Sequence, residues 1–457
     1  MERRFQSRLE ELLDDAVLDP RIPNGMLDRL EQFVAPFAVT LTTSQQRQHA
    51  WEYVAGLFSD VSRKNAETIA YFHDQDRQPL QKFIGQSPWD DRPLIAELVR
   101  QLGTQLGEPD GVLVFDPSAF KKQGKESVGV ARQWCGRLGK VDNCQVGVYL
   151  AYVSRQEHAL VDVRLYLPKK WAKDKQRRRK CGVPRDIRFQ TRHAQALEML
   201  AEHGAVLPHA WIAGDDEMGR SSAFRRELRA LHEQYMLAVP SNTLVRDFEA
   251  KLPAYSGHGR PPQAPFVRVD QWCAALPEDA WMTIDVRDAA RGPLVVQGVK
   301  TRVQAKTDRR RTGPEETLVV LRERQADGTM KHDYYLSNAS SETPLVEFGR
   351  VAKAEHRIEE CLQRAKSEAG LAQYQVRNWI GWHHHQTLSL LAAWFLTQED
   401  RRGKKIHAGS HCPNGSHDYC FSTMSRPKLR ISGLHPSQYQ SPSRAKRDGL
   451  RVPLEIT

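Results

Sequence analysis

The sequence predicts a mixed α/β fold, with a helical region before the sheet and a β-rich region inserted into it. Three observations lead to this prediction. Up to about residue 107, apolar side chains recur at intervals of three and four, which is typical of amphipathic helices. From residue 111, short apolar runs bounded by turn residues predict strands. Between 241 and 346, β-branched and aromatic segments separated by glycine, proline and aspartate predict a β-rich insertion.

The length and charge of the chain narrow the classes of protein that fit. A chain of 457 residues can form two or three domains, because single cores stop growing at roughly 250 to 300 residues. Lys and Arg number 67 against 56 Asp and Glu, and the net charge of +11 favours a polyanionic partner such as nucleic acid. The longest apolar run, 388–396, is too short to span a bilayer. Seven scattered cysteines without a Cys-x-x-Cys pair indicate a reduced, cytoplasmic protein.

The elements follow one another in an order that defines the domains. Residues 1–107 form a helical domain. Residues 108–240 begin the α/β core, with strands expected at 112–115, 145–153, 159–167, 209–213 and 235–240 and helices at 192–203 and 221–233. Three consecutive strands followed by helix, strand, helix and strand predict a mixed sheet with an antiparallel start. After the insertion, helices at about 350–369 and 375–399 complete the core within residues 347–400, and 401–457 form an irregular tail.

Two apolar strands lead directly into acidic residues. The run from Val112 to Phe115 precedes Asp116, and the strand at 209–213 precedes Asp215 and Asp216. If the two strands are neighbours in one sheet, their carboxyl ends bring two acids together where open α/β sheets place their sites. Carboxylates that close repel each other unless a divalent cation joins them. Each acid on its own is equally well explained as a turn-forming residue at a strand end.

A third acid lies on the helix expected at about 350–369. On a helical wheel Glu359 lies at the margin of the apolar stripe, whereas Glu360 points into solvent. Lys366 is two turns further along the same face, where an ammonium group can hold a phosphate beside the carboxylate. A solvated helix face with an ion pair gives the same pattern.

The sequence contains four blocks in a fixed order: GLFSDVSRKNAETIAYF, GVLVFDPSAF, WIAGDDEMGRSSAFRREL and HRIEECLQRAK. Together they resemble bacterial insertion-sequence transposases of the DDE type. More narrowly, they resemble the branch that carries a β-rich insertion between the second aspartate and the glutamate. The resemblance covers about residues 50–400 and implies an RNase H-like core.

The resemblance implies a two-metal phosphoryl-transfer enzyme. Asp116, Asp215 and Glu359 would be the catalytic residues and would hold two Mg²⁺ ions, for which Mn²⁺ can substitute. Relatives carry the second aspartate four residues before a turn glycine, which selects Asp215 over Asp216. They also carry a DNA-contacting lysine seven residues after the glutamate, which corresponds to Lys366.

One position departs from the pattern of these relatives. An arginine is common four residues before the glutamate, whereas this chain has Glu355 there. Arg357 or His356 could replace that arginine as a contact to DNA. Whether the contact exists in this chain stays open.

A basic run, KKWAKDKQRRRK, occupies residues 169–180 and follows a predicted strand. It suits a surface loop that tracks phosphates, and an ordinary solvated charge run is the alternative. The predicted DNA-binding residues in it are Lys169, Lys170, Arg177, Arg178, Arg179 and Lys180.

Two histidine-containing segments suggest metal sites. In WIGWHHHQ the adjacent histidines at 383–385 diverge by about 100° each on a helix, so they cannot share one ion; we interpret them as packing or DNA-facing groups. The tail has a looser group, His407, His411, Cys412, His417 and Cys420, whose spacing fits no zinc finger well. The alternative hypothesis is a frameshift from about residue 407 with a disordered tail, which the nucleotide sequence would decide.

The sequence thus predicts a DNA transposase that cuts and joins phosphodiester bonds at the ends of an insertion sequence. Its expected partners are double-stranded DNA, as terminal inverted repeats and target, and a second copy in a homodimer, with no membrane. The helical domain 1–107 is expected to bind DNA. A catalytically inactive DNA-binding remnant and a structure-selective nuclease on the same fold are the alternatives.

Overall fold

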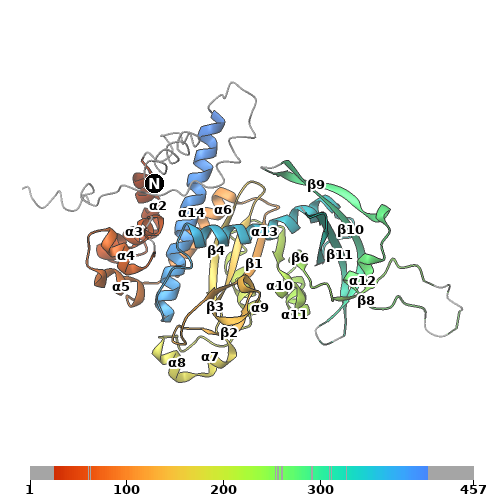
Figure 1. Ribbon diagram of the computed structural model, residues 1–457, viewed down its shortest axis with the longest axis horizontal. Coiled ribbons are helices and arrows are strands. Elements are labelled where there is room, and N and C mark those ends of the chain that lie inside the picture. Colours follow the sequence, from red (N-terminus) through yellow and green to blue (C-terminus); the bar gives the residue numbers. More distant parts are fainter. Residues whose placement is uncertain are drawn as a thin grey trace, which may run out of the picture.

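The computed structural model describes residues 25–409, apart from residues 60, 62, 253, 255–256, 259–260, 290–291, 308, 310 and 326. Figure 1 shows helices at one end, a mixed sheet through the middle and a β-rich part at the other end. The long helix α13 (Leu345–Ser367) crosses the sheet and links the two parts. The predicted mixed α/β class is therefore confirmed.

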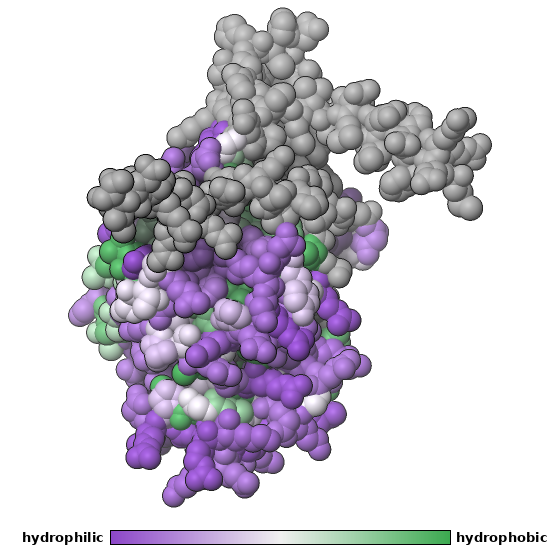
Figure 2. Space-filling view, turned by 90° about the vertical axis from the view of Figure 1, so that its left-hand side faces the viewer, coloured by the Kyte–Doolittle hydropathy of each residue, from purple (hydrophilic) through white to green (hydrophobic). Residues whose placement is uncertain are grey.

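In the described part of the chain, five helices precede the sheet, as the apolar spacing predicts. They are α2 (Met26–Ala38), α3 (Ser44–Phe58), α4 (Ala66–Phe72), α5 (Arg77–Gly85) and α6 (Arg92–Leu106). The side chains of Thr43, Asn65 and Asp76 cap α3, α4 and α5 by accepting backbone N–H groups. Their apolar faces pack around α14 (Trp379–Gly409). Figure 2 shows this side of the molecule, where hydrophilic residues cover most of the surface that is coloured.

The central strands have the RNase H-like arrangement. The strands are β1 (Val112–Lys121), β3 (Lys140–Val153), β4 (His158–Leu165), β5 (Trp211–Gly214) and β6 (Tyr235–Ala238). They lie in the order β4-β3-β1-β5-β6; the first three are antiparallel, and β5 and β6 run parallel to β1. A short strand that the sequence did not predict, β2 (Ala131–Cys135), continues into a 3₁₀ turn at Gly136–Leu138 and pairs with the start of β3.

Strand β1 is longer than predicted. It does not end at Phe115 but continues to Lys121, because β3 pairs with it along its whole length. The parallel partner β5 stops earlier, at the pair Phe115 and Gly214. Asp116 therefore lies within a strand, at the point where that strand loses its parallel neighbour.

The helices of the core are partly as predicted. Observed are α7 (Lys169–Lys173), α8 (Lys175–Lys180), α9 (Arg192–His203), α10 (Asp216–Arg220) and α11 (Ser222–Ala230). The basic run was predicted as a loop, and this prediction is wrong: it forms α7 and α8. The reason is local, because Asp174 caps α8 by accepting the Arg177 N–H at 2.9 Å and Trp171 is buried beneath the segment.

The β-rich insertion continues the same sheet. Its elements are β7 (Leu244–Asp247), β8 (Val267–Arg268), α12 (Val269–Ala274), β9 (Met282–Ala289), β10 (Gly292–Lys306), β11 (Thr312–Arg324) and β12 (Met330–Ser337), with a 3₁₀ turn at Glu278–Ala280. β12 pairs antiparallel with β6 of the core. The insertion predicted as β-rich also contains the short helix α12, in which Val269 and Cys273 are buried on one side.

Helix α14 also extends beyond its predicted end. The tail was expected from residue 401, but the helix runs to Gly409 because Glu399 binds Arg29 at 2.6 Å and Arg402 at 3.0 Å across its last turns. Residues 410–457, with most of the His/Cys group and the suspected frameshift, lie outside the described residues. No helix in the part that the structure describes is long and apolar enough to cross a membrane. The five cysteines in that part are free thiols.

Candidate active site

The register of two parallel strands sets the two aspartates side by side. β1 and β5 are paired from Val112 with Trp211 to Phe115 with Gly214. The next residues in line are Asp116 and Asp215, at the carboxyl end of the parallel pair. This is the juxtaposition that the sequence predicts if the two strands are neighbours.

A tight turn after β5 fixes the direction of Asp215. Its side chain caps α10 by accepting the Met218 N–H at 3.1 Å. The turn packs closely on β6, because a Cβ at Gly219 would lie 1.9 Å from the Ala238 carbonyl oxygen. Only glycine fits this approach. Asp216, the other candidate, is exposed and pairs with Arg220 at 3.0 Å.

Helix α13 contributes the third acid and the lysine. Asp116, Asp215, Glu359 and Lys366 all line one cavity of about 1620 Å³. The Lys366 Nζ donates to Ser118 Oγ at 2.8 Å, two residues after Asp116 on β1. Three acids from three different elements thus face one space, with an ammonium group beside them.

Electrostatics make this cavity unfavourable for carboxylates. Burial raises the pKa of Asp116 to about 6; the charge of Lys366 opposes this rise and that of Glu359 adds to it. Burial, followed by the charge of Asp116, raises the pKa of Asp215 to about 8. Raised carboxyl pKa values mean that each added negative charge costs free energy here, which is the state that a bound cation relieves.

A fourth acid, Glu355, does not line the cavity but interacts electrostatically with the acids that do, and it was not predicted as a site residue. It lies one turn before Glu359 on α13 and is 9% exposed. Burial, followed by the charges of Asp215, Glu359 and Asp116, raises its pKa to about 8. The sequence singled out this position only as one where relatives carry arginine.

Further residues around the cavity were missed. Arg192 at the start of α9 pairs with Glu217, and the His193 side chain contacts the Glu217 carbonyl oxygen at 3.0 Å through Nε2. Trp134 on β2 lies at the cavity with 56% of its surface exposed. No motif marks these residues, because their place depends on how α9 and β2 pack against the sheet.

Some predicted DNA-binding residues lie elsewhere. Arg357 does not line the cavity; it forms an ion pair with Glu360 on the other side of α13. In the basic segment, Arg177 stacks on Trp171 at 3.9 Å and Lys180 pairs with Glu126. The Arg178 side chain donates to the Ala172 and Pro184 carbonyl oxygens, whereas Lys169, Lys170 and Arg179 are exposed.

The adjacent histidines of α14 point to different partners, as the helical wheel predicts. His384 stacks on Trp89 with ring centroids 3.5 Å apart and lies 2.8 Å from the Trp89 carbonyl oxygen through Nε2. His385 contacts the Tyr53 hydroxyl at 2.8 Å through Nδ1. These two histidines bind α14 to the N-terminal helices, so the packing interpretation is the one that fits.

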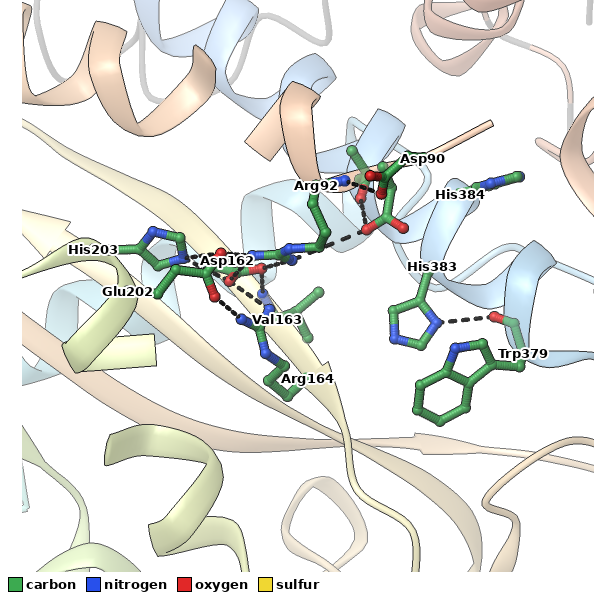
Figure 3. A network of polar contacts seen from close by, with 12 residues as sticks. Asp90, Arg92, Asp162, Val163, Arg164, Glu202, His203, Trp379, His383 and His384 are labelled. Atoms are coloured by element: carbon green, nitrogen blue, oxygen red, sulfur yellow. Dashed lines mark hydrogen bonds and ion pairs between the residues drawn. The ribbon is translucent and has the colours of Figure 1, made fainter. Parts of the chain in front are cut away.

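A second acidic cluster lies apart from the cavity (Figure 3). The described residues contain one group of three metal-ligating side chains whose ligand atoms all lie within 4.8 Å of one another: Asp162, Glu202 and His203. Asp162 accepts both ends of the Arg92 guanidinium at 3.0 and 2.8 Å and one Arg164 N–H at 2.6 Å. With its oxygens already bound by cationic donors, it is suited to hold α6, β4 and α9 together rather than to bind a metal.

Comparison with known proteins places the chain in a family. The profile of the family described as DDE superfamily endonuclease matches residues 36–293, more than half of the chain. The chain therefore belongs to this family, which confirms the resemblance found in the sequence.

One sequence relative and one solved structure are similar to this chain. The chain is 38% identical over 104 residues to the probable transposase for insertion sequence element IS701 of Microchaete diplosiphon, covering 22% of this chain and 27% of that relative. The match thus spans about a quarter of the relative's length. The structure titled piggyBac transposase synaptic complex with hairpin DNA aligns over 95% of this chain and 91% of that chain at 10% identity, with a TM-score of 0.36, too low to establish a shared fold.

Proposed function

We propose that the protein is a DNA transposase that cuts and joins phosphodiester bonds at the ends of an insertion sequence. The observation that carries the proposal is the meeting of Asp116, Asp215 and Glu359 from three elements in one cavity, beside Lys366. The family match and the insertion-sequence relative support it. In this proposal the protein acts in the cytoplasm, on chromosomal DNA.

The donor set fits divalent metal ions. Carboxylate oxygens are the ligands that Mg²⁺ and Mn²⁺ prefer, and the buried, mutually repelling acids gain most from a cation. Two Mg²⁺ ions held by these three residues would polarise the phosphate and lower the pKa of an attacking water or 3′-hydroxyl. Among the described residues, the three carboxylates do not all lie within 4.8 Å of one another, so the proposal concerns the ligand set and not a finished geometry.

The chain's own residues would position the DNA. We infer that Lys366, placed by its bond to Ser118, binds the phosphate next to the cleaved bond. The exposed Trp134 at the cavity offers a flat surface for stacking on a base. The exposed side chains of Lys169, Lys170 and Arg179 would contact backbone phosphates, and two copies would act together on paired ends.

The test uses a plasmid that carries the gene's own locus with both flanks. Protein and Mg²⁺ or Mn²⁺ are added, and new 3′-hydroxyl ends are mapped. We expect cuts at a pair of inverted repeats for the wild type and none for Glu359→Gln. The matched control is Glu360→Gln, an acid on the same helix that points away from the cavity and should leave cutting unchanged.

Two other outcomes separate the alternatives. DNA binding without cutting in either metal would replace the proposal with a catalytically inactive remnant. Cutting at junctions without regard to inverted repeats, and without strand joining, would identify a structure-selective nuclease on the same fold.

A further inference from the structure

Glu355 is a buried carboxylate that the three-acid site does not use. It lies four residues before Glu359 on α13, so the two side chains project from the same face of the helix one turn apart. Glu359 is exposed and lines the cavity, whereas Glu355 is 9% exposed, does not line the cavity, and lies on a helix that packs against β1 and β5. Glu355 therefore faces the same strands that carry Asp116 and Asp215.

The described part of the chain gives this carboxylate little compensation. The ion pair that it forms there is with its own neighbour His356, whose Nδ1 atom lies 3.5 Å from Oε2. Burial lowers the pKa of His356, so this ring tends to be neutral. After burial, the charges that raise the pKa of Glu355 most are those of acids, with Asp215 the strongest. A buried carboxylate whose ion-pair partner tends to be neutral is costly to a fold.

We propose that Glu355 is a fourth carboxylate ligand of the metal centre and binds the same divalent cation as Asp215. This inference rests on the proposed function, because it concerns the cation of that site. It also explains the departure from relatives: a residue that would repel a cation is replaced by one that binds it. Glutamate in place of arginine changes the charge next to the metal by two units. The metal centre of this protein should therefore bind cations more tightly than the centre of a relative that carries arginine at this position.

The experiment measures metal binding by the full-length protein without DNA. Free Mn²⁺ is followed by electron paramagnetic resonance during titration of the wild type and of Glu355→Gln, which keeps the shape of the side chain and removes its charge. We expect Glu355→Gln to weaken Mn²⁺ binding by about 10- to 100-fold. Glu355→Arg should weaken it further, and the exposed control Glu360→Gln should stay within about twofold of the wild type.

A second measurement guards against a folding defect. The rise in melting temperature on adding Mn²⁺ should be large for the wild type and small for Glu355→Gln, while metal-free Glu355→Gln should melt at the same temperature as the metal-free wild type or higher, because it lacks the buried charge. A shift in Glu355→Gln equal to that of the wild type would overturn the inference.

Asp116→Asn separates this inference from the proposed function. If Asp116→Asn loses Mn²⁺ and Glu355→Gln binds it as the wild type does, the inference is wrong and the proposed site stands. If neither variant differs from the wild type, both are wrong.

Discussion

Two acidic clusters in this protein each contain buried or half-buried carboxylates, yet they differ in what surrounds these carboxylates. Although burial alone would raise it, Arg164, His203 and Arg92 lower the pKa of Asp162, whose oxygens are fully bound. In the cavity, Asp116 and Asp215 have raised pKa values. Burial therefore affects both the acid of the ion-pair network and the acids of the candidate active site, and the number of cationic donors distinguishes the two clusters.

Activity should depend on the uncompensated cluster most strongly. Asp116→Asn is expected to reduce DNA cleavage by at least about 1,000-fold, because a catalytic ligand is lost, while the fold stays as stable as the wild type or becomes more stable. Cleavage rates and thermal melts measured on the same preparation check both parts. A variant that cuts normally would remove Asp116 from the site.

Stability should depend on the compensated cluster. Asp162→Ala leaves Arg92 and Arg164 without the buried carboxylate that they share, so that only the exposed Glu202 still pairs with both, and we expect it to lower the free energy of unfolding by about 3 to 5 kcal/mol. Urea denaturation gives the value. The control is Glu202→Gln at the exposed edge of the same cluster, with an expected loss of about 1 kcal/mol or less. Equal losses in the two variants would mean that Asp162 is not the centre of the network.

The two clusters should respond to pH in opposite directions. Asp116, Asp215 and Glu355 have raised pKa values, so the stability they contribute is full below about pH 4 and is lost as pH rises through about 6 to about 8. Asp162 has a lowered pKa, so its contribution is present above about pH 4 and is lost as pH falls further.

Unfolding in urea between pH 5 and 9, with the metal chelated, tests this difference. We expect the free energy of unfolding to fall by about 2 kcal/mol or more as pH rises, and added Mg²⁺ to restore part of it. Glu355→Gln should flatten the curve. If the free energy of unfolding rises with pH in the absence of metal, the negative charges of the cavity acids are stabilised by other groups, and the raised pKa values are wrong.

The parts of the site that the sequence predicts are those with a local signal. Asp116 and the pair Asp215 and Asp216 follow apolar runs, and Glu359 lies at the edge of a helical stripe, so periodicity narrows the candidates. The choice of Asp215 over Asp216 came from the resemblance to transposases. Glu355 lacks such a signal, because a helical wheel cannot say which strand faces an acid. Its burial depends on how α13 crosses the sheet, which is a property of tertiary packing.

The fold divides in the same way. Long elements with a clear period, such as β3 and α14, were predicted in kind though not in their ends. Short elements such as β2 and α10 were missed, because five residues hold too little pattern. The helical form of the basic segment was missed for a different reason. Asp174 is an N-cap residue, but among so many basic residues it was not recognised as the start of a helix.

The smallest expected effect concerns the basic segment. Whether it binds DNA or is a solvated charge run can be decided from the slope of log affinity for DNA against log salt concentration. Lys169 and Lys170 are exposed, whereas the Arg178 side chain is bound to two carbonyl oxygens of its own segment. If the segment binds DNA, the double variant Lys169→Gln, Lys170→Gln should reduce the slope of log affinity against log salt by about 2, since each phosphate contact contributes about 0.9.

Arg178→Gln is the matched control. It also removes a positive charge from the segment, but the Arg178 side chain is held by bonds within the protein, so it is not expected to contact DNA. We expect it to change the slope by less than one contact and to lower the melting temperature slightly, whereas the double lysine variant should leave the melting temperature unchanged. Equal slopes for the wild type and the double variant would identify the segment as a solvated surface. The phosphate contacts would then have to come from the side chains around the cavity, with Lys366 first among them.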